Sequence, residues 1–377
     1  MERKKILTVK ERTRILVAPL DWGLGHAARC IPIIRELLEH NTEVIIAADG
    51  RPYELLKKEF PTINILRLPG FTIVYPEGNR ITAKIVSQIP KIIAAIFREH
   101  RALSNIIRDL KIDAVISDNR FGLFSKQIPC IYVTHQIGIM MPERLQWASR
   151  IVYHLNKVLI RNYTACWIPD YEENDNLSGW LSHFYPLPKN ATFIGPLTRF
   201  KKNSNIPKEY DILIILSGPE PQRTALENIM MEQLKTVQRK SLVVRGIPEK
   251  SQHIKLSEWI SVVSSLDSET LNRAMLASDI IISRPGYSTI MDLDVLGKRA
   301  IFIPTPGQTE QEYLAAELKK SGKFYMQQQE KFSLIDALEQ AKLYPGFSPR
   351  VSYTSTVKVS IEKLLERFQG EQIAKVQ

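Results

Sequence analysis

The chain has 377 residues, of which 51 are Lys or Arg and 40 are Asp or Glu, so its formal charge is +11. Hydrophobic residues make up 44% of the chain, aromatic residues 8% and charged residues 24%. These values exclude a disordered or fibrous chain, and the length predicts two domains because a domain has about 100–200 residues.

The cysteines and the apolar segments narrow the class of protein further. Cys30, Cys130 and Cys166 are odd in number and far apart, which fits neither a disulfide framework nor a zinc cluster. The segment MERKKILTVKERTRILVAPL lacks the uninterrupted apolar core of a signal peptide, and no segment reaches the roughly 18 consecutive apolar residues of a spanning helix. We therefore expect a cytoplasmic protein. Its basic surplus suits nucleic acid, anionic lipid or a phosphorylated small molecule equally well.

In the first half of the chain, short apolar runs alternate with helical patterns. A strand is predicted at 14–20, followed by a glycine-containing loop and an amphipathic helix at 27–40. A helix is predicted at 51–60, and further strands at 42–48, 63–68, 114–118, 131–135 and 165–170. Strands that are apolar throughout are covered on both faces, so these runs predict a parallel sheet between layers of helices.

A second series of the same kind follows a change in composition at 186–207. This segment is rich in Pro, Asn and Lys and has little periodicity, which predicts an interdomain linker. Strands are then predicted at 211–217, 241–246, 260–263, 279–284 and 299–304. The sequence therefore predicts two doubly wound α/β domains, at 1–195 and 196–355, and a C-terminal helix at 356–377 that returns to the first domain.

The first loop, with the sequence DWGLGH, lies between a predicted strand and a predicted helix. Gly23 and Gly25 allow backbone to approach a ligand closely, and a helix N-terminus stabilises negative charge. The run from Gly23 to Ala28 also satisfies the relaxed dinucleotide fingerprint G-x-G-x-x-A, with Asp49 as the only acid near the expected ribose position. A histidine inside the loop is unusual for such a site, so the dinucleotide interpretation is the weaker one.

His26 is the first candidate catalytic residue. A histidine at a junction between loop and helix can be neutral near physiological pH and can accept a proton from an attacking hydroxyl group. It can equally be a structural histidine bonded to a neighbouring carbonyl. The residue type alone does not choose between these two interpretations.

A second polar cluster occupies 283–318. Ser288 or Thr289 is placed to cap the helix after the strand at 279–284, and the backbone amides there would face a phosphate. Asp292, inside that helix, is placed to accept hydrogen bonds from a ribose diol. Polar groups in the next loop suit sugar hydroxyls; they belong to Gln308, Thr309, Glu310 and Gln311. Turn chemistry and a polar helix start explain the same residues without a ligand.

Together the two clusters resemble the family 28 glycosyltransferases of the GT-B fold, which include the MurG-type N-acetylglucosaminyltransferases and the plant monogalactosyldiacylglycerol synthases. The family's GGH ending matches Gly25 and His26, and its S-R-x-G run matches Ser283, Arg284 and Gly286. The resemblance implies two Rossmann-like domains facing across a cleft. It places the acceptor beside the first domain and a nucleotide sugar on the second.

The resemblance also assigns roles to residues of the second domain. The family's ribose-binding carboxylate falls on Asp292, an Asp in place of a Glu. Its pair of glutamines that contact the donor sugar falls on Gln311 and Glu312, and the second position departs from the pattern. A glycine-rich turn near the diphosphate falls on Ser217 and Gly218.

Other positions match more loosely. His135 follows a strand as the first residue of a His-Glu pair does in the family, and acceptor loops are expected at 70–80 and at 118–122, which includes Asp118 and Asn119. Arg199 in the linker and Arg245 at a strand end are candidates to neutralise the leaving nucleoside diphosphate. Either one has the ordinary alternative of a surface arginine.

No metal and no cofactor besides the nucleotide sugar is expected. The run Asp292-Leu293-Asp294 lies inside a helical pattern, which is not the context of a DxD metal motif. A guanidinium can do the charge neutralisation that a metal ion otherwise does.

A basic amphipathic helix is predicted at 88–111. Isoleucines and leucines share one face, and five cations lie off it: Lys91, Arg98, Arg101, Arg108 and Lys111. Such a helix can lie on anionic lipid at the inner face of a membrane. Each cation then contributes about 1 kcal/mol to binding. It can also pack on the sheet with a solvated basic back.

The sequence therefore predicts an inverting, metal-independent glycosyltransferase. It would move a hexose or N-acetylhexosamine from a nucleotide sugar, which we expect to be UDP-linked, to a hydroxyl of a lipid or glycan acceptor. A sugar-nucleotide 2-epimerase or hydrolase of the same fold and a non-catalytic nucleotide-sugar sensor are the alternatives. Nucleic acid is not an expected partner, because the basic residues lack interleaved aromatics and no RNP, KH or helix-turn-helix signature is present.

Overall fold

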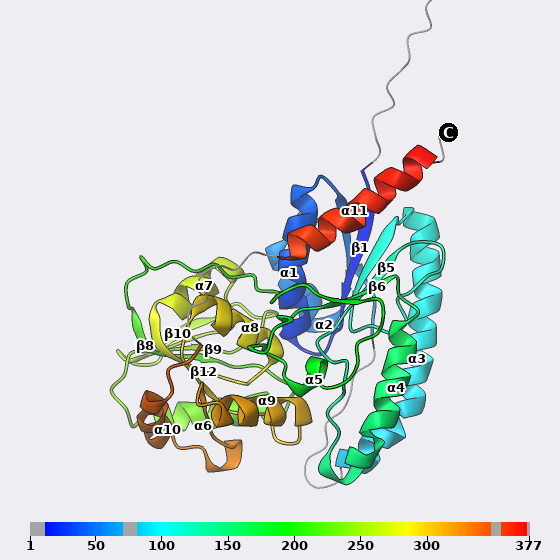
Figure 1. Cartoon of the computed structure of the whole chain (residues 1–377). Helices are drawn as coiled ribbons and strands as arrows, with labels where there is room; N and C mark the ends of the chain where they lie inside the picture. Colours follow the sequence, from blue (N-terminus) through cyan, green and yellow to red (C-terminus); the bar gives the residue numbers. More distant parts are fainter. Residues whose placement is uncertain (1–11, 71–80, 348–355, 375–377) are drawn as a thin grey trace, which may run out of the picture.

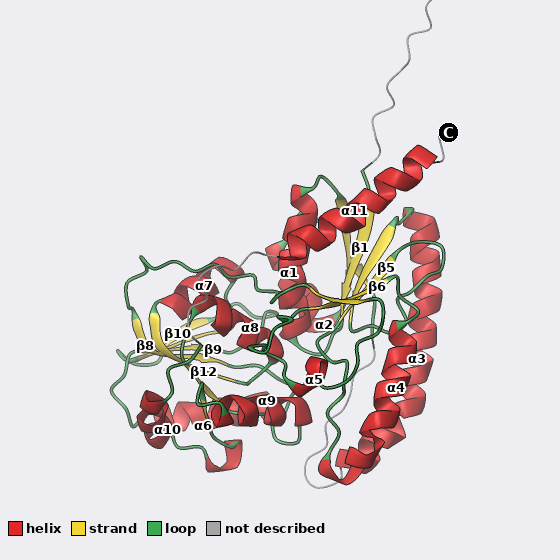
Figure 2. Cartoon of the chain, viewed as in Figure 1, coloured by secondary structure: helices red, strands yellow, loops and turns green. Residues whose placement is uncertain are grey.

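Two mainly parallel sheets, one in each half of the chain, are each packed between helices (Figures 1 and 2). The computed structural model describes residues 12–70, 81–347 and 356–374. We call the part built on the first sheet the first lobe and the part built on the second sheet the second lobe.

The first sheet has seven parallel strands in the order β3-β2-β1-β4-β5-β6-β7. The chain therefore builds outward from β1 on one side and from β4 on the other. The strands are β1 (Arg14–Pro19), β2 (Glu43–Ala48), β3 (Ile65–Arg67), β4 (Ala114–Asp118), β5 (Cys130–Val133), β6 (Ala165–Ile168) and β7 (Ala191–Phe193).

Helices cover both faces of this sheet because successive strand residues point in opposite directions. Ile15 and Val17 of β1 pack with the two helices that precede β3 in the sequence. Leu16 and Ala18 pack with the two long helices that follow β3. The helices are α1 (Leu24–Glu39), α2 (Gly50–Glu59), α3 (Ile81–Leu110), α4 (Ser149–Ile160) and α5 (Trp180–His183), and the 3-10 helix η1 (Glu143–Ala148) precedes α4.

The second sheet repeats this plan in the order β10-β11-β9-β8-β12-β13-β14, with an antiparallel strand, β10, at one edge. Its strands are β8 (Tyr210–Ile215), β9 (Ser241–Val244), β10 (His253–Lys255), β11 (Ile260–Val263), β12 (Ser278–Ser283), β13 (Ala300–Phe302) and β14 (Tyr325–Met326). The helices of this lobe are α6 (Gln222–Leu234), α7 (Ser268–Leu276), α8 (Tyr287–Leu296), α9 (Thr309–Lys320) and α10 (Leu334–Gln340).

The predicted architecture of two doubly wound sheets is confirmed, and each strand predicted from an apolar run is present. Three strands were not predicted: β7, β10 and β14. Each has only two or three residues, which is too short for a run or an alternation to stand out.

The linker prediction at 186–207 is wrong for Ala191–Phe193, which forms β7 and pairs with β6. Main-chain hydrogen bonds hold such an edge strand whatever its side chains are. Because the surrounding segment is rich in Pro, Asn and Lys, no strand pattern stood out in it. The next segment is also packed, since Leu197 and Phe200 are buried.

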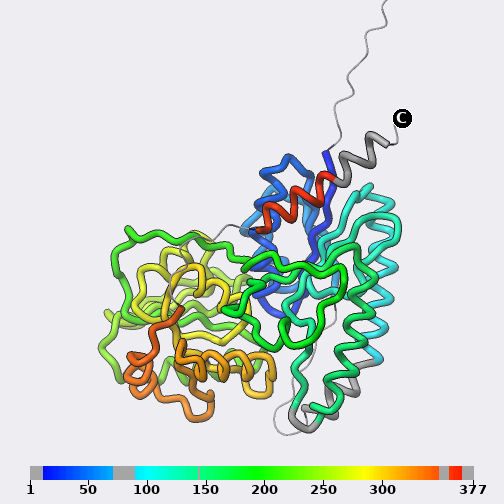
Figure 3. The backbone as a smooth tube through the Cα atoms, in the orientation of Figure 1, coloured from blue at the N-terminus to red at the C-terminus, as the bar shows by residue number. Residues whose placement is uncertain are grey.

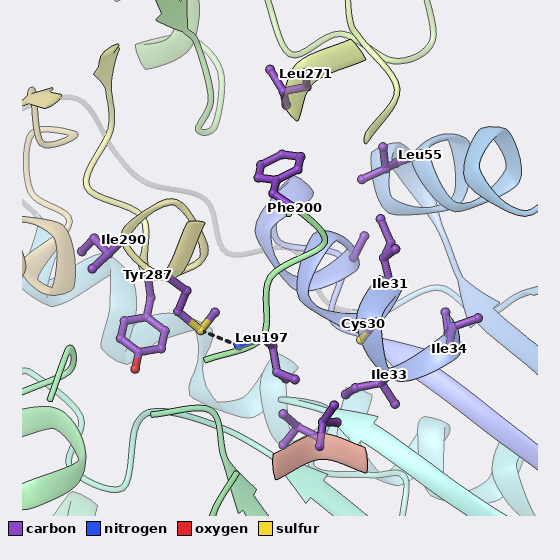
Figure 4. Close-up of a cluster of buried hydrophobic side chains, with 14 of the residues drawn as sticks. Cys30, Ile31, Ile33, Ile34, Leu55, Leu197, Phe200, Leu271, Tyr287 and Ile290 are labelled. Atoms are coloured by element: carbon purple, nitrogen blue, oxygen red, sulfur yellow. Dashed lines mark hydrogen bonds between the residues drawn. The ribbon is translucent and has the colours of Figure 1, made fainter. Parts of the chain in front are cut away.

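One buried hydrophobic cluster continues from the first lobe into the second (Figure 4). It includes Ile31 of α1, Phe200 of the connecting segment and Leu271 of α7. The backbone N–H of Leu197 also donates to Met291 Sδ at 3.2 Å. The lobes are therefore packed against each other along the connection and not only tethered by it.

The last helix, α11 (Thr356–Ala374), packs against α1 of the first lobe (Figures 1 and 3). Val357, Ile361 and Leu364 are buried in the cluster that contains the apolar side of α1. The chain thus returns to the first lobe after building the second.

Helix α3 contains the predicted basic helix and is packed along only part of its apolar side. Leu103 is buried, and Ile107 and Leu110 pack against the same cluster. Ile93 and Phe97 are instead 49% and 70% exposed. Ala95 and Glu99 are buried as well, so, among the side chains of α3 that the structure describes, the packed side runs from Ala95 to Leu110.

Candidate active site

The predicted site residues gather at the carboxyl ends of the central strands in both lobes. In the first sheet, β1 and β4 are neighbours from which the chain builds in opposite directions, and they lead to His26 and end at Asp118. In the second sheet, β8 and β12 have the same relationship; β8 leads to Ser217, and β12 ends at Ser283. Loops diverge at such a switch point, which is where open α/β sheets bind ligands.

His26 and Asp118 form a close pair. The Nδ1 atom of His26, in the first turns of α1, lies 2.8 Å from Asp118 Oδ1. The Asp118 side chain is fully buried, whereas 15% of the His26 side chain is exposed. A buried carboxylate thus holds a histidine that is within reach of solvent.

Arg29 joins this pair from one turn further along α1. Its Nε and Nη2 atoms bond the two carboxylate oxygens of Asp118, and Nη2 lies 2.9 Å from His26 Nδ1. Its Nη1 atom lies 3.0 Å from His135 Nδ1, beyond the end of β5. One buried guanidinium therefore contacts three residues that come from different strand ends.

Glu310 reaches the same network from the second lobe. Its Oε1 atom, in the first turn of α9, lies 2.8 Å from His135 Nε2, and the side-chain amide of Gln136 donates to Oε2. The His135 ring also stacks on Tyr287 of α8, with 4.0 Å between ring centres and 2° between ring planes. The lobes are in direct polar and aromatic contact at this point.

Burial and neighbouring charge set the protonation of this network. Burial raises the pKa of Asp118, but Arg29 and His26 together lower it well below its usual range. Burial lowers the pKa of His135 more than Glu310 raises it. Burial raises the pKa of Glu310, but its hydrogen bond with His135 and its interactions with His135, His26 and Arg29 outweigh that effect and lower it. Asp118 and Glu310 are therefore ionised at neutral pH, and His135 is neutral.

Nδ1 of His26 has two neighbours, one of which requires a proton on this nitrogen and the other a lone pair. It can donate a proton to Asp118 or accept one from Arg29, but a single ring nitrogen cannot do both. In the first case the neutral ring keeps the lone pair of Nε2, which can accept a proton. In the second case the proton sits on Nε2 and the ring is no base.

On the second lobe, helix α8 faces the first loop and the connection. The hydroxyl of Ser288 donates to the carbonyl oxygen of Gly25 at 2.8 Å. Gly286 is the N-cap residue of α8, and a Cβ added there would lie 3.9 Å from Thr289 Oγ1. The amides at the start of α8 thus lie beside the loop that carries His26.

Asp292 lies further along α8, against the connecting segment. It is half-buried, and its Oδ1 atom accepts a hydrogen bond of 2.6 Å from Thr198 Oγ1. Burial raises the pKa of Asp292 to about 7, although Arg199 and Thr198 act in the opposite direction. Among the described residues, Arg199 Nε and Nη1 are buried without hydrogen-bond partners. The expected ribose carboxylate and the expected arginine are therefore neighbours.

The loop before α9 and its first turn place the other predicted donor residues. Gln311 Oε1 accepts from Thr305 N, and Glu312 Oε1 from Gly307 N, each at 2.9 Å. Thr309 Oγ1 donates to the carbonyl oxygen of Met140 in the first lobe, also at 2.9 Å. These side chains shape the loop and the contact between the lobes.

Near the strand ends of the second lobe, the buried polar atoms without a hydrogen-bond partner in the described part of the chain include Ser283 Oγ, Arg284 Nε, Thr305 Oγ1 and Gln308 Oε1. Gly218 lies close to one of them, because a Cβ added at this glycine would be 3.6 Å from Thr305 Oγ1. Its φ of +106° favours glycine. The turn after β8 and the loop after β13 therefore meet above β12.

Two predicted arginines are engaged inside the second lobe. Arg284 is buried and donates to the carbonyl oxygens of Ile303, Pro304 and Gln222, each at 3.0 Å. Arg245 forms an ion pair with Glu227, in which Nε lies 2.7 Å from Oε1. The contacts of both guanidinium groups are with the protein itself.

The acceptor-side residues are partly described. Gly23 has a φ of +85° and precedes α1 as its N-cap residue. Asn119 Oδ1 accepts from Tyr132 OH at 3.2 Å. Gly70 N donates to Asp21 Oδ2 at 3.0 Å, which ties the loop after β3 to the first loop. The remaining part of the predicted acceptor loop, 71–80, lies outside the described residues.

Sequence reasoning missed Arg29, the buried centre of the network. Its only signal is its position three residues after His26 on the same helix, which places the two side chains on one face. His135 was predicted, but its contact with Glu310 depends on how the lobes pack.

Over residues 12–70, 81–347 and 356–374, no group of three or more His, Cys, Asp or Glu side chains is arranged to hold a metal ion. Within the same ranges, no helix is both long and apolar enough to span a bilayer. The two carboxylates of the run at 292–294 are bonded to hydroxyl groups, Asp292 to Thr198 and Asp294 to Tyr171.

Known proteins resemble the chain over most of its length. Residues 226–354 match the family described as Glycosyltransferase family 28 C-terminal domain. An uncharacterized glycosyltransferase of Methanosarcina acetivorans is 23% identical over 336 residues, which cover 82% of this chain and 82% of the relative.

A second relative is the UDP-N-acetylglucosamine-N-acetylmuramyl-(pentapeptide) pyrophosphoryl-undecaprenol N-acetylglucosamine transferase of Caldanaerobacter subterraneus. It is 22% identical over 359 residues, which cover 90% of this chain and 91% of the relative. The crystal structure of the calicheamicin glycosyltransferase CalG4 superposes with a TM-score of 0.59 at 10% identity, covering 94% of this chain and 93% of that one. The likeness to CalG4 concerns the fold alone.

Proposed function

This chain is a glycosyltransferase of the family 28 type with a GT-B fold, and from that premise we propose that it is an inverting enzyme that transfers a hexose or N-acetylhexosamine from a UDP-sugar to a hydroxyl group of a lipid acceptor. The donor would bind to the second lobe, at 196–355, and the acceptor to the first, at 1–195. The reaction would need no metal and no cofactor besides the nucleotide sugar.

The pairing of His26 with the buried Asp118 carries this proposal. An ionised Asp118 that accepts the Nδ1 proton leaves Nε2 of the neutral ring free to take a proton. If Arg29 donated to Nδ1 instead, the lone pair of Nδ1 would face the ionised Asp118 Oδ1 at 2.8 Å, and Nη2 of Arg29 already has Oδ1 as an acceptor. The tautomer that donates to Asp118 is therefore favoured. His26 is then the general base.

The proposed reaction is a single displacement. As Nε2 of His26 takes the proton of the acceptor hydroxyl, the oxygen attacks the anomeric carbon and the bond from that carbon to the diphosphate breaks. The electron pair of the broken bond leaves with the UDP. Attack from the face opposite the leaving group inverts the anomeric configuration.

Groups on the second lobe are suited to each part of the donor. Backbone amides at the start of α8, near Gly286 and Ser288, would bind the diphosphate because they lie at a helix N-terminus. Asp292 would bind the ribose diol. The proposed sugar contacts are Gln308, Gln311 and Glu312, and the proposed diphosphate contacts of the neighbouring loops and connection are Ser217, Gly218, Ser283, Thr289, Arg199 and Arg245.

Two observations support a UDP-sugar and a lipid acceptor. The name of the Caldanaerobacter relative states a UDP-N-acetylglucosamine donor and an undecaprenol-linked acceptor. In addition, an apolar stripe on η1 and α4 of this chain faces solvent, with side-chain exposures of 73%, 53%, 60% and 58% for Trp147, Ile151, Leu155 and Val158.

The geometry of this stripe suits the surface of a membrane. The four residues recur at helical spacing on one face, whereas Tyr153, Asn156 and Ile160 of α4 are buried on the other. Arg150, His154 and Arg161 are exposed beside the stripe. Exposed apolar side chains next to Arg150 and Arg161 fit an anionic lipid surface, so we propose that the enzyme lies at the inner face of the membrane.

The test is a transfer assay on the purified chain. UDP-N-acetylglucosamine, UDP-glucose and UDP-galactose would be supplied separately with a lipid extract, and UDP release and glycolipid formation would be measured. We expect one donor to give a glycolipid of inverted anomeric configuration, with undiminished activity in the presence of EDTA. Formation of N-acetylmannosamine from UDP-N-acetylglucosamine without an acceptor would indicate the epimerase instead. UDP-sugar binding without transfer to any acceptor would indicate a sensor.

A further inference from the structure

A carboxylate of the second lobe contacts the residues around the proposed base of the first. Glu310 is separated from His135 by 175 positions in the sequence, yet their side chains lie 2.8 Å apart. Glu310 is in the first turn of α9, directly before the proposed sugar contacts Gln311 and Glu312. Its two oxygens are engaged by His135 and Gln136.

The hydrogen-bond donors in this network form one consistent sequence. Arg29 has only donors, so its Nη1 donates to Nδ1 of His135. The proton of the neutral His135 ring must then be on Nε2, where it is donated to Glu310. The other nitrogens of Arg29 donate to Asp118, which also accepts from His26. Glu310 therefore accepts the Nε2 proton of the His135 tautomer that the contact with Arg29 requires.

Arg29 is the link between the two ends of this network. Its guanidinium is 2% exposed and bonds both oxygens of Asp118, so its orientation fixes the carboxylate that holds His26. Nη1 is the one nitrogen of this guanidinium that is bonded to His135. A change in the position of the His135 ring therefore alters the orientation of Arg29. Through Arg29 it also alters the orientation of the Asp118 carboxylate.

We propose that Glu310 is a positioning residue, whose carboxylate aligns the proposed base His26 through His135, Arg29 and Asp118 when the two lobes are in contact. The inference rests on the proposed function. It means that the base is correctly oriented only while α9, which also carries the proposed sugar contacts, lies against the first lobe. Glu310 itself then contacts neither the donor nor the acceptor.

Two further contacts beside Glu310 support this assignment. Ser288 of α8 holds the carbonyl oxygen of Gly25, the residue before His26. Tyr287 stacks on His135 and donates its hydroxyl to the carbonyl oxygen of Pro169 at 2.9 Å. The second lobe thus touches the loop of His26 and the ring of His135 at the same time.

The test compares Glu310→Gln and Glu310→Ala with Glu317→Gln. Glu317 is on the same helix, where it is exposed and pairs only loosely with Lys320, with 3.9 Å between the charged atoms. We expect Glu310→Ala to lower kcat about 10-fold and Glu310→Gln to lower it less. The dissociation constant for UDP, measured by titration, should stay within about 2-fold, and Glu317→Gln should match the parent chain. A merely structural role would weaken UDP binding and kcat together.

A double substitution tests the route through His135. If Glu310 acts through His135, the variant His135→Ala/Glu310→Ala should be no slower than His135→Ala alone, because interacting residues are not additive. Multiplication of the two separate losses would overturn the proposal, and so would a Glu310→Gln variant with the kcat of Glu317→Gln. If Glu310→Ala does not fold, Glu310→Gln and its combination with His135→Gln give the same comparison. Absence of transfer by the parent chain would instead contradict the proposed function.

Discussion

His26 Nδ1 lies 2.8 Å from Asp118 Oδ1, although 92 positions separate the two residues in the sequence. They meet because β1 and β4 are neighbours in the sheet and both end at the same edge. The proposed base therefore lies in the first turn of α1, the helix after β1, and the carboxylate that orients it is the last residue of β4.

Replacement of the base is the most direct prediction. In His26→Ala, turnover should fall by roughly 10²-fold or more, because a general base typically contributes that much. Binding of UDP, which the second lobe is proposed to hold, should persist within about 2-fold. Turnover would be measured from UDP release, and binding by titration calorimetry. A turnover equal to that of the parent chain would remove His26 from the mechanism.

Asp292 should make the stability of the protein depend on pH. Burial raises the pKa of its carboxyl group to about 7, far above that of an unfolded Asp. Between about pH 4 and pH 7 the folded chain thus holds a proton here that the unfolded chain has lost, so this group lowers stability as the pH rises through that window. Position 292 cannot titrate in Asp292→Asn. The melting temperature of this variant, relative to that of the parent, should therefore be higher at pH 8 than at pH 5.

The control for this prediction is Asp279→Asn, at an exposed carboxylate of β12 that pairs with Lys208. Its melting temperature relative to the parent should show no such gain between pH 5 and pH 8. If Asp292→Asn shows the same relative melting temperature at both pH values, the group is ionised in the folded chain throughout. Asp292→Ala should also bind UDP more weakly, and an unchanged affinity would discard its assignment to the ribose.

Arg284 provides a prediction about stability and donor binding together. Arg284→Met keeps an unbranched apolar stem but removes the guanidinium, which leaves the carbonyl oxygens of Ile303, Pro304 and Gln222 without this donor. A buried polar group left unpaired costs about 1–3 kcal/mol, so we expect a loss of about 3 kcal/mol in the free energy of unfolding. Urea denaturation would measure this loss. An unaltered unfolding midpoint combined with weaker UDP binding would instead indicate that the guanidinium contacts the donor.

The apolar stripe on η1 and α4 should be required for membrane binding. The double variant Trp147→Ser/Leu155→Ser should lose most of its sedimentation with vesicles that contain anionic lipid, because burial of each large apolar side chain contributes about 1.5–3 kcal/mol. Parent binding should weaken as salt screens the neighbouring cations.

The matched control is Leu343→Ser, which removes an apolar side chain that is 75% exposed on the second lobe. This variant should sediment with vesicles as the parent chain does. Equal binding by Trp147→Ser/Leu155→Ser and the parent would show that the stripe has another role.

Much of the fold was predictable because buried parallel strands are continuous apolar runs. The segments at 114–118 and 260–263 match β4 and β11 without any change of boundary. Strand β7 was mistaken for linker, since Ala191–Phe193 is held at the sheet edge by main-chain pairing with β6 and its side chains carry no pattern.

The candidate site was predictable only where its residues are close in the sequence. The run from Gly23 to His26 and the run from Ser283 to Asp292 were found because strand, loop and helix follow one another directly. The role of Glu310 was not accessible in this way. Its position beside Gln311 indicated a sugar contact, whereas the packing of the lobes places it on His135.

The sequence by itself determined two doubly wound sheets and the loops at their strand ends, because hydrophobic periodicity and turn residues act over short distances along the chain. Only the tertiary structure decided that Arg29 joins Asp118 to His135 and that Glu310 reaches this network from the other lobe. The physical reason is that these charged groups are stable in a buried place only beside partners of opposite charge or matching hydrogen-bond capacity. Strand order and lobe packing bring those partners together, and neither can be inferred from a local sequence pattern.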